Sequence, residues 1–259
     1  MMNKTYEKAL STIEFYQFHP EYKPFIGNQY DEFKILQVGE SHYIGQCVKD
    51  HEDDFPIQYF DKWWTDPCNE LRQHRDCRPS EGVWGSWYDT RAVIERFLNT
   101  RSNRGYSIFA NMLRSFDRVY LNKETVHMDK ETKKHFQYFS FMNFFQMPSL
   151  YEGKKYWDSL LKSAQKQGNE QLAYELWDKA VKISVNMLDA VINILKPNVV
   201  VITSVSAYDT YHTVHGNDPK IIKATHPCCS WWNRKHGEDN LTGRERLEKS
   251  LMELQVTKQ

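Results

Sequence analysis

The sequence predicts an α/β fold, a three-layer α/β/α arrangement around a central, mostly parallel sheet of four strands. Two patterns predict it. Short apolar runs alternate along the chain with longer segments in which apolar residues recur with the period of a helix. One run, at 199–202, is apolar at every position, which is typical of a strand buried on both faces of a parallel sheet. Strands that alternate with helices build such a sheet and cover both of its faces.

The four strands are expected where an apolar run meets turn residues. The first run ends at Gly39, and Pro148 closes the second. The third run follows Pro197, and the fourth leads directly into His226 and Pro227. In chain order, the expected strands are residues 33–38, 136–145, 199–202 and 220–225.

The expected helices are amphipathic segments with recognisable ends. Asn169 is a favourable N-cap for a long helix whose apolar stripe continues to Leu195, and Pro197 marks its end. A shorter helix carries Ile108 and Met112 on one face. The expected helices are residues 91–98, 107–116, 169–195, 204–211 and 243–254.

The chain is expected to form one domain over residues 1–259. It contains no internal repeat and no linker rich in Gly and Ser. Residues 44–88 interrupt the strand–helix alternation with an irregular stretch crowded with Trp, Asp, Cys, Pro and His. We expect this stretch to be an insertion packed by its own aromatic side chains.

The composition excludes several classes of protein. Aromatic residues make up 14% of the chain, so it can bury enough apolar surface to exclude collagen and wholesale disorder. No window approaches the ~18 apolar residues of a membrane helix, and residues 1–11 lack the apolar core of a secretory leader. The five cysteines are an odd number, which favours free thiols in a reducing compartment. We therefore expect a soluble, cytoplasmic monomer without a membrane partner.

The charge is balanced overall but unevenly spread. With 34 Lys and Arg against 34 Asp and Glu the net charge is zero, which argues against binding nucleic acid through bulk electrostatics alone. Residues 43–70 hold seven acids and two lysines, a net −5, whereas residues 91–118 hold six arginines and two acids, a net +4. These segments are either two solvated faces or, for the second, a local patch that holds phosphates.

Polar residues occur where three of the expected strands end. Gly-Glu-Ser-His-Tyr follows the first strand at 39–43, Asn143 lies in the second run, and His-Pro-Cys-Cys-Ser follows the fourth at 226–230. Ligands of parallel α/β sheets bind beyond the carboxyl ends of the strands. We therefore expect these three segments to meet at one crevice.

In this order, the three segments resemble the motifs of the uracil-DNA glycosylase superfamily. Its members carry G-Q-D-P-Y or G-E-A-P-G after the first strand, an Asn in or after the second, and H-P-S after the last. The resemblance covers residues 33–233 apart from the insertion. It implies a glycosylase-like fold and a protein that excises uracil or a related deaminated base from DNA by hydrolysis of the N-glycosidic bond.

The resemblance also implies roles for individual residues. Asn143 would read the flipped base, and His226 would face the pyrimidine oxygen. Glu40 would supply the catalytic carboxylate, as in the G-E-A-P-G branch. The base pocket would be completed by Gly39, Ser41, His42, Tyr43 and, as a stacking platform, Tyr106.

Three residues would contact DNA. In the superfamily the loop after H-P-S enters the minor groove and a bulky side chain fills the vacated space. Trp231 and Trp232 occupy that loop here, and Arg104 belongs to the basic segment. A plain hydrophobic anchor is the alternative for the two tryptophans.

The chain departs from the family motifs at three residues and in the spacing of its cysteines. Ser41 stands where G-Q-D-P-Y has its Asp, His42 replaces the Pro, and Cys228 replaces the Ser of H-P-S. The G-E-A-P-G branch carries an iron–sulfur cluster on four cysteines, whose spacings are not found here, so no cofactor is expected. These departures leave open a non-catalytic relative that binds nucleic acid, a free nucleobase or a nucleotide.

Simpler roles also remain open for the site residues. Glu40 could cap a helix, Asn143 could hydrogen-bond neighbouring backbone, His226 could be a packed turn residue, and His42 could be a surface turn residue. Tyr106 could be a core aromatic. A zinc site and a metal-dependent enzyme using His42, His51 or Asp residues are weaker alternatives, and the chain shows no established zinc spacing. The zinc site would use His51, Cys68, His74 and Cys77.

Overall fold

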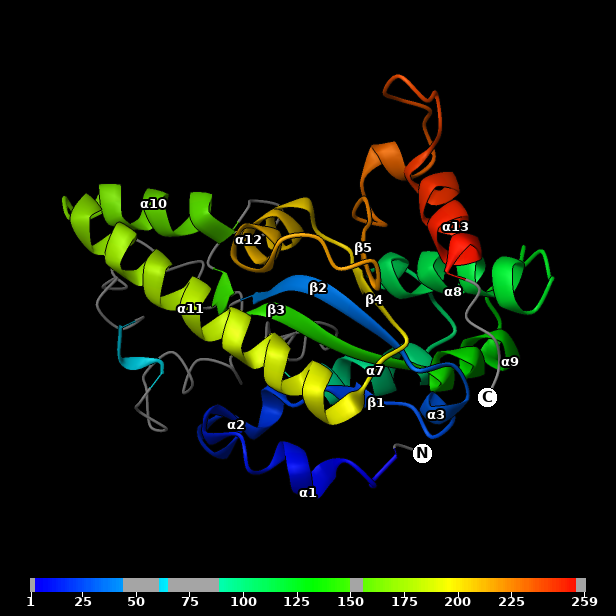
Figure 1. The fold of residues 1–259 in the computed structure, drawn as a ribbon, viewed down its shortest axis with the longest axis horizontal. Coiled ribbons are helices and arrows are strands. Elements are labelled where there is room, and N and C mark those ends of the chain that lie inside the picture. Colours follow the sequence, from blue (N-terminus) through cyan, green and yellow to red (C-terminus); the bar gives the residue numbers. More distant parts are fainter. Residues whose placement is uncertain (1–2, 44–60, 65–88, 150–155, 255–259) are drawn as a thin grey trace.

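A computed structural model describes residues 3–43, 61–64, 89–149 and 156–254 of the chain (Figure 1). Within these residues it is an α/β protein built on one mixed sheet. The strands are β1 (Phe25–Ile26), β2 (Ile35–Tyr43), β3 (Phe139–Ser149), β4 (Val199–Ile202) and β5 (Ile221–Lys223), in the order β1-β3-β2-β4-β5.

The expected sheet of four strands is wrong in one respect. The four expected strands all form and pair in parallel, as β3-β2-β4-β5. A fifth strand, β1, adds antiparallel to β3 at the edge and makes the sheet mixed. The sequence did not reveal β1, because a strand of two residues is too short to show an alternating pattern. Directly after β1, a Cβ on Gly27 would lie 2.0 Å from the carbonyl oxygen of Gln137, so the chain can pass this close only with glycine.

The five expected helices form, with boundaries shifted by a few residues. Asn169 caps the longest of them, its side-chain oxygen accepting a hydrogen bond from the N–H of Leu172. Further helical segments, most of them short, were not expected from the sequence. The helical segments are α1 (Glu7–Leu10), α2 (Glu14–Phe18), η1 (Pro20–Tyr22), α3 (Tyr30–Phe33), α7 (Thr90–Asn99), α8 (Ser107–Tyr120), α9 (Lys130–Lys133), η3 (Lys134–Tyr138), α10 (Tyr156–Lys166), α11 (Glu170–Leu195), α12 (Val205–His215), η4 (Ser230–Trp232) and α13 (Gly243–Glu253).

Helices pack on both faces of the sheet. On one face, α11 and α12 bury residues such as Leu188 against Leu36 and Val38 of β2. On the other face, α7, α8 and α13 bury residues such as Phe109 against Phe141 of β3. Figure 1 shows α10 beside the outer half of α11, where the pair extends past the sheet. The alternation of side chains along each strand separates the two apolar layers.

Part of the expected insertion belongs to the main core. Residues 44–60 and 65–88 lie outside the described residues, but Trp63 and Trp64 are 0% and 6% exposed in the α11-side core. The ring of Trp63 stacks on His19 at 4.2 Å, and its N–H donates to the carbonyl of Gln146 at 2.9 Å. The expectation that the insertion packs by its own aromatics is therefore wrong for these two residues.

The order of the parallel strands creates a reversal point in the sheet. The chain runs from β2 to β3 on one side and then crosses to β4 on the other side of β2. Connections therefore leave the carboxyl ends of neighbouring strands in opposite directions, which opens the crevice where ligands bind in such sheets. Of the helices in the described residues, none combines the length and apolar character that crossing a bilayer requires.

Candidate functional site

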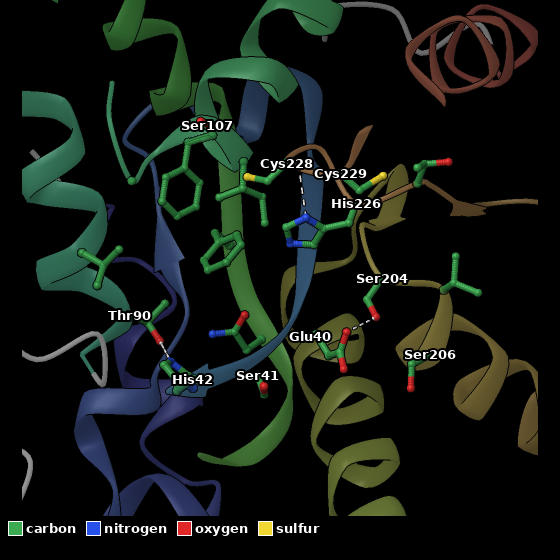
Figure 2. Close-up of a pocket in the computed structure, with 18 of the residues that line it drawn as sticks. Glu40, Ser41, His42, Thr90, Ser107, Ser204, Ser206, His226, Cys228 and Cys229 are labelled. Atoms are coloured by element: carbon green, nitrogen blue, oxygen red, sulfur yellow. Dashed lines mark hydrogen bonds between the residues drawn. The ribbon is translucent and has the colours of Figure 1, made fainter. Parts of the chain in front are cut away.

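A cavity of about 800 Å³ lies at the carboxyl ends of the parallel strands. Its lining comes from the end of β2, Phe141 and Asn143 in the first half of β3, the residues after β4, the loop after β5, and the N-terminal turns of α7 and α8. Figure 2 shows Glu40, Ser204 and His226 around one side of this hollow, with His42 and Thr90 at the other. Segments far apart in the chain thus meet at the expected edge of the sheet.

Most of the expected site residues line this cavity. They are Glu40, Ser41, His42, Asn143, His226 and Trp231. Gly39 is not part of the lining but is the register partner of Asn143 on the neighbouring strand. The side chain of Tyr43 lies outside the described residues, and Tyr106, Trp232 and Arg104 are not part of the lining.

Asn143 forms the floor of the cavity, and Gly39 lies beside it on the adjacent strand. They are register partners on β2 and β3, and a Cβ on Gly39 would lie 2.3 Å from the side-chain oxygen of Asn143. The missing side chain therefore makes room for the amide. Among the described residues this amide has no hydrogen-bond partner, so the alternative that it binds neighbouring backbone finds no support. The backbone carbonyl of Asn143 instead accepts from the side-chain amide of Gln146.

Glu40 is held at the end of β2 by a residue of the neighbouring connection. The hydroxyl of Ser204 donates to Oε2 of Glu40 at 2.8 Å. The same hydroxyl accepts from the N–H of Ala207 at 3.2 Å, which makes Ser204 the N-cap of α12. Ser204 rather than Glu40 therefore caps this helix, and the carboxylate lies beside the positive end of the helix dipole.

The backbone defines which nitrogen of His226 carries the proton. The N–H of Cys228 donates to Nδ1 at 3.2 Å, which leaves the proton of the neutral ring on Nε2. Burial lowers the pKa of His226 below its ordinary value of 6.5, so the ring is neutral near pH 7. The loop itself is tied to α8, because Asn111 donates to the carbonyl of Pro227 at 2.6 Å and accepts from Arg114 at 2.8 Å.

His42 forms a buried wall rather than a surface turn. It is 3% exposed, its Nε2 lies 2.9 Å from the hydroxyl of Thr90, and its ring contacts the ring of Tyr22 edge-on at 4.2 Å. Burial lowers its pKa to about 3. The ring is therefore neutral across the physiological range, and the alternative of a surface turn residue is wrong.

The residues expected to contact DNA divide into two groups. Trp231 is 51% exposed at the cavity, and Arg104 is exposed beside Gly105, which lines the cavity. Trp232, in contrast, is 1% exposed in the α8-side core. Its expected DNA contact is wrong, because consecutive residues of the short η4 turn point in different directions and only one of them reaches the surface.

Tyr106 does not line the cavity, so its ring is not placed to stack on a base there. It is the N-cap residue of α8, and its ring packs against Phe97 at 5.8 Å and Phe109 at 6.5 Å. The rings of Phe109 and Phe141, which meet edge to face at 5.0 Å, line the cavity together with Trp231. The alternative of a core aromatic is the better description of Tyr106.

The cysteines and the metal alternative are only partly described. Cys228 and Cys229 are free thiols that line the cavity. The four residues of the zinc alternative, His51, Cys68, His74 and Cys77, lie outside the described residues. In the part of the chain that the structure describes, no group of three or more His, Cys, Asp or Glu side chains is arranged to hold a metal ion.

Sequence reasoning missed three residues that shape the site. Ser204 lies just beyond the end of β4, so the rule that polar residues gather at strand ends could have found it. Thr90 and Asn111 lie on helices and contact His42 and Pro227. Helical periodicity predicts which face of a helix is buried but not which residue a polar side chain contacts. No sequence signal distinguishes them from other polar helix residues.

Comparison of the chain with protein-family models, with curated proteins and with solved structures finds no match. The function of the cavity therefore has to be inferred from its own residues.

Proposed function

We propose that the cavity binds a nucleobase and that the protein is a divergent relative of the uracil-DNA glycosylases, with a fold of their three-layer type. Its proposed reaction is hydrolysis of the N-glycosidic bond of uracil, or of a related deaminated base, in DNA. One observation carries the proposal: Asn143, His226 and Glu40, from three distant segments, line the same cavity at the carboxyl ends of the strands.

The floor of the cavity suits a flat heterocycle with a polar edge. The amide of Asn143 has both a donor and an acceptor free of partners among the described residues, and these can pair with adjacent groups on one edge of a base. The rings of Phe109 and Phe141 supply apolar surface beside it. Enzymes that act on a base take it out of the stack and read it by such an amide and such rings.

His226 supports the departure of the base. Cleavage leaves the electron pair of the glycosidic bond on the base, whose ring nitrogen and carbonyl oxygen share the negative charge. The neutral imidazole with its proton on Nε2 is a hydrogen-bond donor that can stabilise this oxygen without transferring a full charge. The loop that carries it is tied to α8, so the donor is oriented before the ligand arrives.

Glu40 supports the other half of the reaction. Bond cleavage leaves positive charge on the sugar, which a carboxylate stabilises. Water then adds to the sugar carbon, and the proton it loses passes to the carboxylate as general base. Oε2 of Glu40 accepts from Ser204, which holds one oxygen of the carboxylate that we assign as the general base.

The mouth of the cavity supports DNA as the partner. Trp231 is an exposed aromatic residue there, and an exposed ring can fill a vacated base position or stack on a neighbouring base. Arg104 is exposed nearby and can contact phosphate. All of these residues come from one chain, so a monomer suffices for the proposed activity.

A non-catalytic relative is the second candidate. Ser41, which lines the cavity at the third position of the first motif, cannot supply a carboxylate. Such a protein would bind nucleic acid, a free base or a nucleotide in the same cavity and would leave the substrate unchanged.

The deciding experiment measures release of uracil from single-stranded and duplex oligonucleotides at low salt. The wild type is expected to release base faster than the double variant Glu40→Gln/His226→Ala. Equal release by the two proteins would contradict the enzymatic proposal. Titration with free uracil and with the same oligonucleotides then tests the second candidate, which requires binding without base release.

A further inference from the structure

Ser204 occupies a junction between the sheet, a helix and the candidate carboxylate. It is 2% exposed and lies between β4 and α12. Just before it, Thr203 donates both its backbone N–H and its hydroxyl to the carbonyl of Val38, at 2.8 and 2.9 Å. Val38 is two residues before Glu40 in β2, so pairing between the strands sets how far Ser204 lies from Glu40.

The hydroxyl of Ser204 has one proton and two lone pairs, and its contacts determine where the proton goes. Because the oxygen accepts from the N–H of Ala207, it acts toward the helix as an acceptor. Its single proton is then directed to Oε2 of Glu40, 2.8 Å away. The cap of α12 and one hydrogen bond of the carboxylate therefore share the same atom.

We infer that Ser204 is a positioning residue for Glu40, which it holds by one oxygen at the N-terminus of α12. This inference deepens the proposed function and rests on it for its catalytic consequence. Glu40 has three rotatable side-chain bonds, and a carboxylate on such a chain can sample several rotamers. A hydrogen bond to a charged group, made by a residue that is itself anchored in the backbone, restricts that freedom.

The inference makes different predictions for substitutions that keep or remove the cap. Ser204→Thr keeps a hydroxyl and a favourable N-cap and should retain activity. Ser204→Ala loses both contacts and should lower kcat of base release about tenfold while KM stays unchanged, because the buried Ser204 acts through Glu40. Ser204→Asp keeps a strong N-cap but places a second carboxylate beside Glu40, so it should lower kcat further, about 100-fold.

A control separates loss of a helix cap from loss of the carboxylate contact. Asn169→Ala removes the N-cap of α11, which lies away from the cavity lining, and should leave kcat unchanged. If Ser204→Asp retained the wild-type kcat, the cap alone would explain the role of Ser204 and the inference would be overturned. It would also be overturned if Ser204→Ala raised KM and left kcat unchanged.

A second measurement tests the contact without relying on activity. In a double-mutant cycle with Ser204→Ala and Glu40→Ala, the loss of thermal stability caused by Ser204→Ala should be smaller when Glu40 is already absent. Additive losses would overturn the inference even in an active protein. If the wild type releases no base, the proposed reaction fails, and the cycle alone decides whether Ser204 holds Glu40.

Discussion

The two faces of the sheet are packed alike at the middle of the strands and differently at their carboxyl ends. On the α11 side, apolar side chains continue to the ends of the strands, and Phe144 and Ile202 are both 0% exposed. On the α8 side, apolar packing continues only as far as Phe141, beyond which the cavity opens. The α11 side of β3 and β4 is therefore a filled core, whereas the cavity opens on the α8 side of β3 and extends to Glu40 and the first turn of α12.

The difference results from two neighbouring residues. On the α8 side, Gly39 has no side chain and Asn143 presents an amide, so the apolar row of β2 and β3 is interrupted at one level. On the α11 side, the next residue of β3 is Phe144, whose ring packs edge-on against Phe145 at 4.9 Å. The cavity thus opens where β2 and β3 lack large apolar side chains on the α8 side.

The largest expected effect is on the filled face. Leu188 of α11 is 0% exposed, so Leu188→Ala should lower the free energy of unfolding by about 2–5 kcal/mol, through lost burial and the cavity left behind. Asn143→Ala on the hollow face should change it by less than about 1 kcal/mol but should weaken base binding tenfold or more. Denaturant unfolding and ligand titration of both variants measure the contrast. A large loss of stability in Asn143→Ala would show that the amide is part of the core.

The next effect concerns His42, the buried histidine in the lining of the cavity. Burial lowers the pKa of His42 to about 3 from its ordinary value of 6.5. Between these two pH values the imidazole is protonated in the unfolded chain and neutral in the folded chain. The free energy of unfolding therefore decreases as the pH falls from 6.5 toward 3, by at most about 1.4 kcal/mol per pH unit. In His42→Gln this contribution is absent, so the variant should lose less stability than the wild type between about pH 6 and about pH 4.

Unfolding curves at several pH values check this expectation. The control is His127→Gln, which replaces an exposed histidine and should leave the pH dependence as in the wild type. Identical slopes for His42→Gln and the wild type would mean that the ring of His42 is accessible to protons in the folded state.

The smallest effect tests the floor of the cavity. Gly39→Ala places a Cβ where the oxygen of Asn143 now lies, so the amide must move and base affinity should fall about tenfold. Gly27→Ala is the matched control, because its Cβ would meet the backbone of Gln137 at the far edge of the sheet. It should lower stability and leave base affinity unchanged. Equal affinity of Gly39→Ala and the wild type would show that the amide does not contact the ligand.

The regular part of the fold was visible in the sequence because its signals are long or repetitive. The uninterrupted apolar run of β4 and the capped, periodic α11 each contain several residues that agree on one structure. The two-residue β1 and the four-residue α1 and α3 contain too few residues for any period. Their conformations depend on contacts with distant segments, such as the hydrogen bond from Gly27 N–H to the carbonyl of Phe139.

The site was predicted to a similar extent. The rule that polar residues gather beyond strand ends predicted that Glu40, Asn143 and His226 meet, and all three line one cavity. It did not distinguish Trp231 from Trp232, because neighbouring residues in a short turn have no period that assigns one of them to the surface. It also missed Asn111, whose contact with Pro227 joins segments 116 residues apart.

By itself, the order of residues determined the longer strands and helices, because their patterns depend on neighbours along the chain. It also determined that polar groups lie near the places where expected strands end. Only the tertiary structure decided which polar groups share a hollow, which tryptophan is buried and which hydroxyl holds the carboxylate of Glu40. Those outcomes depend on distances between segments far apart in the chain, and such distances exist only once strands have paired and helices have packed.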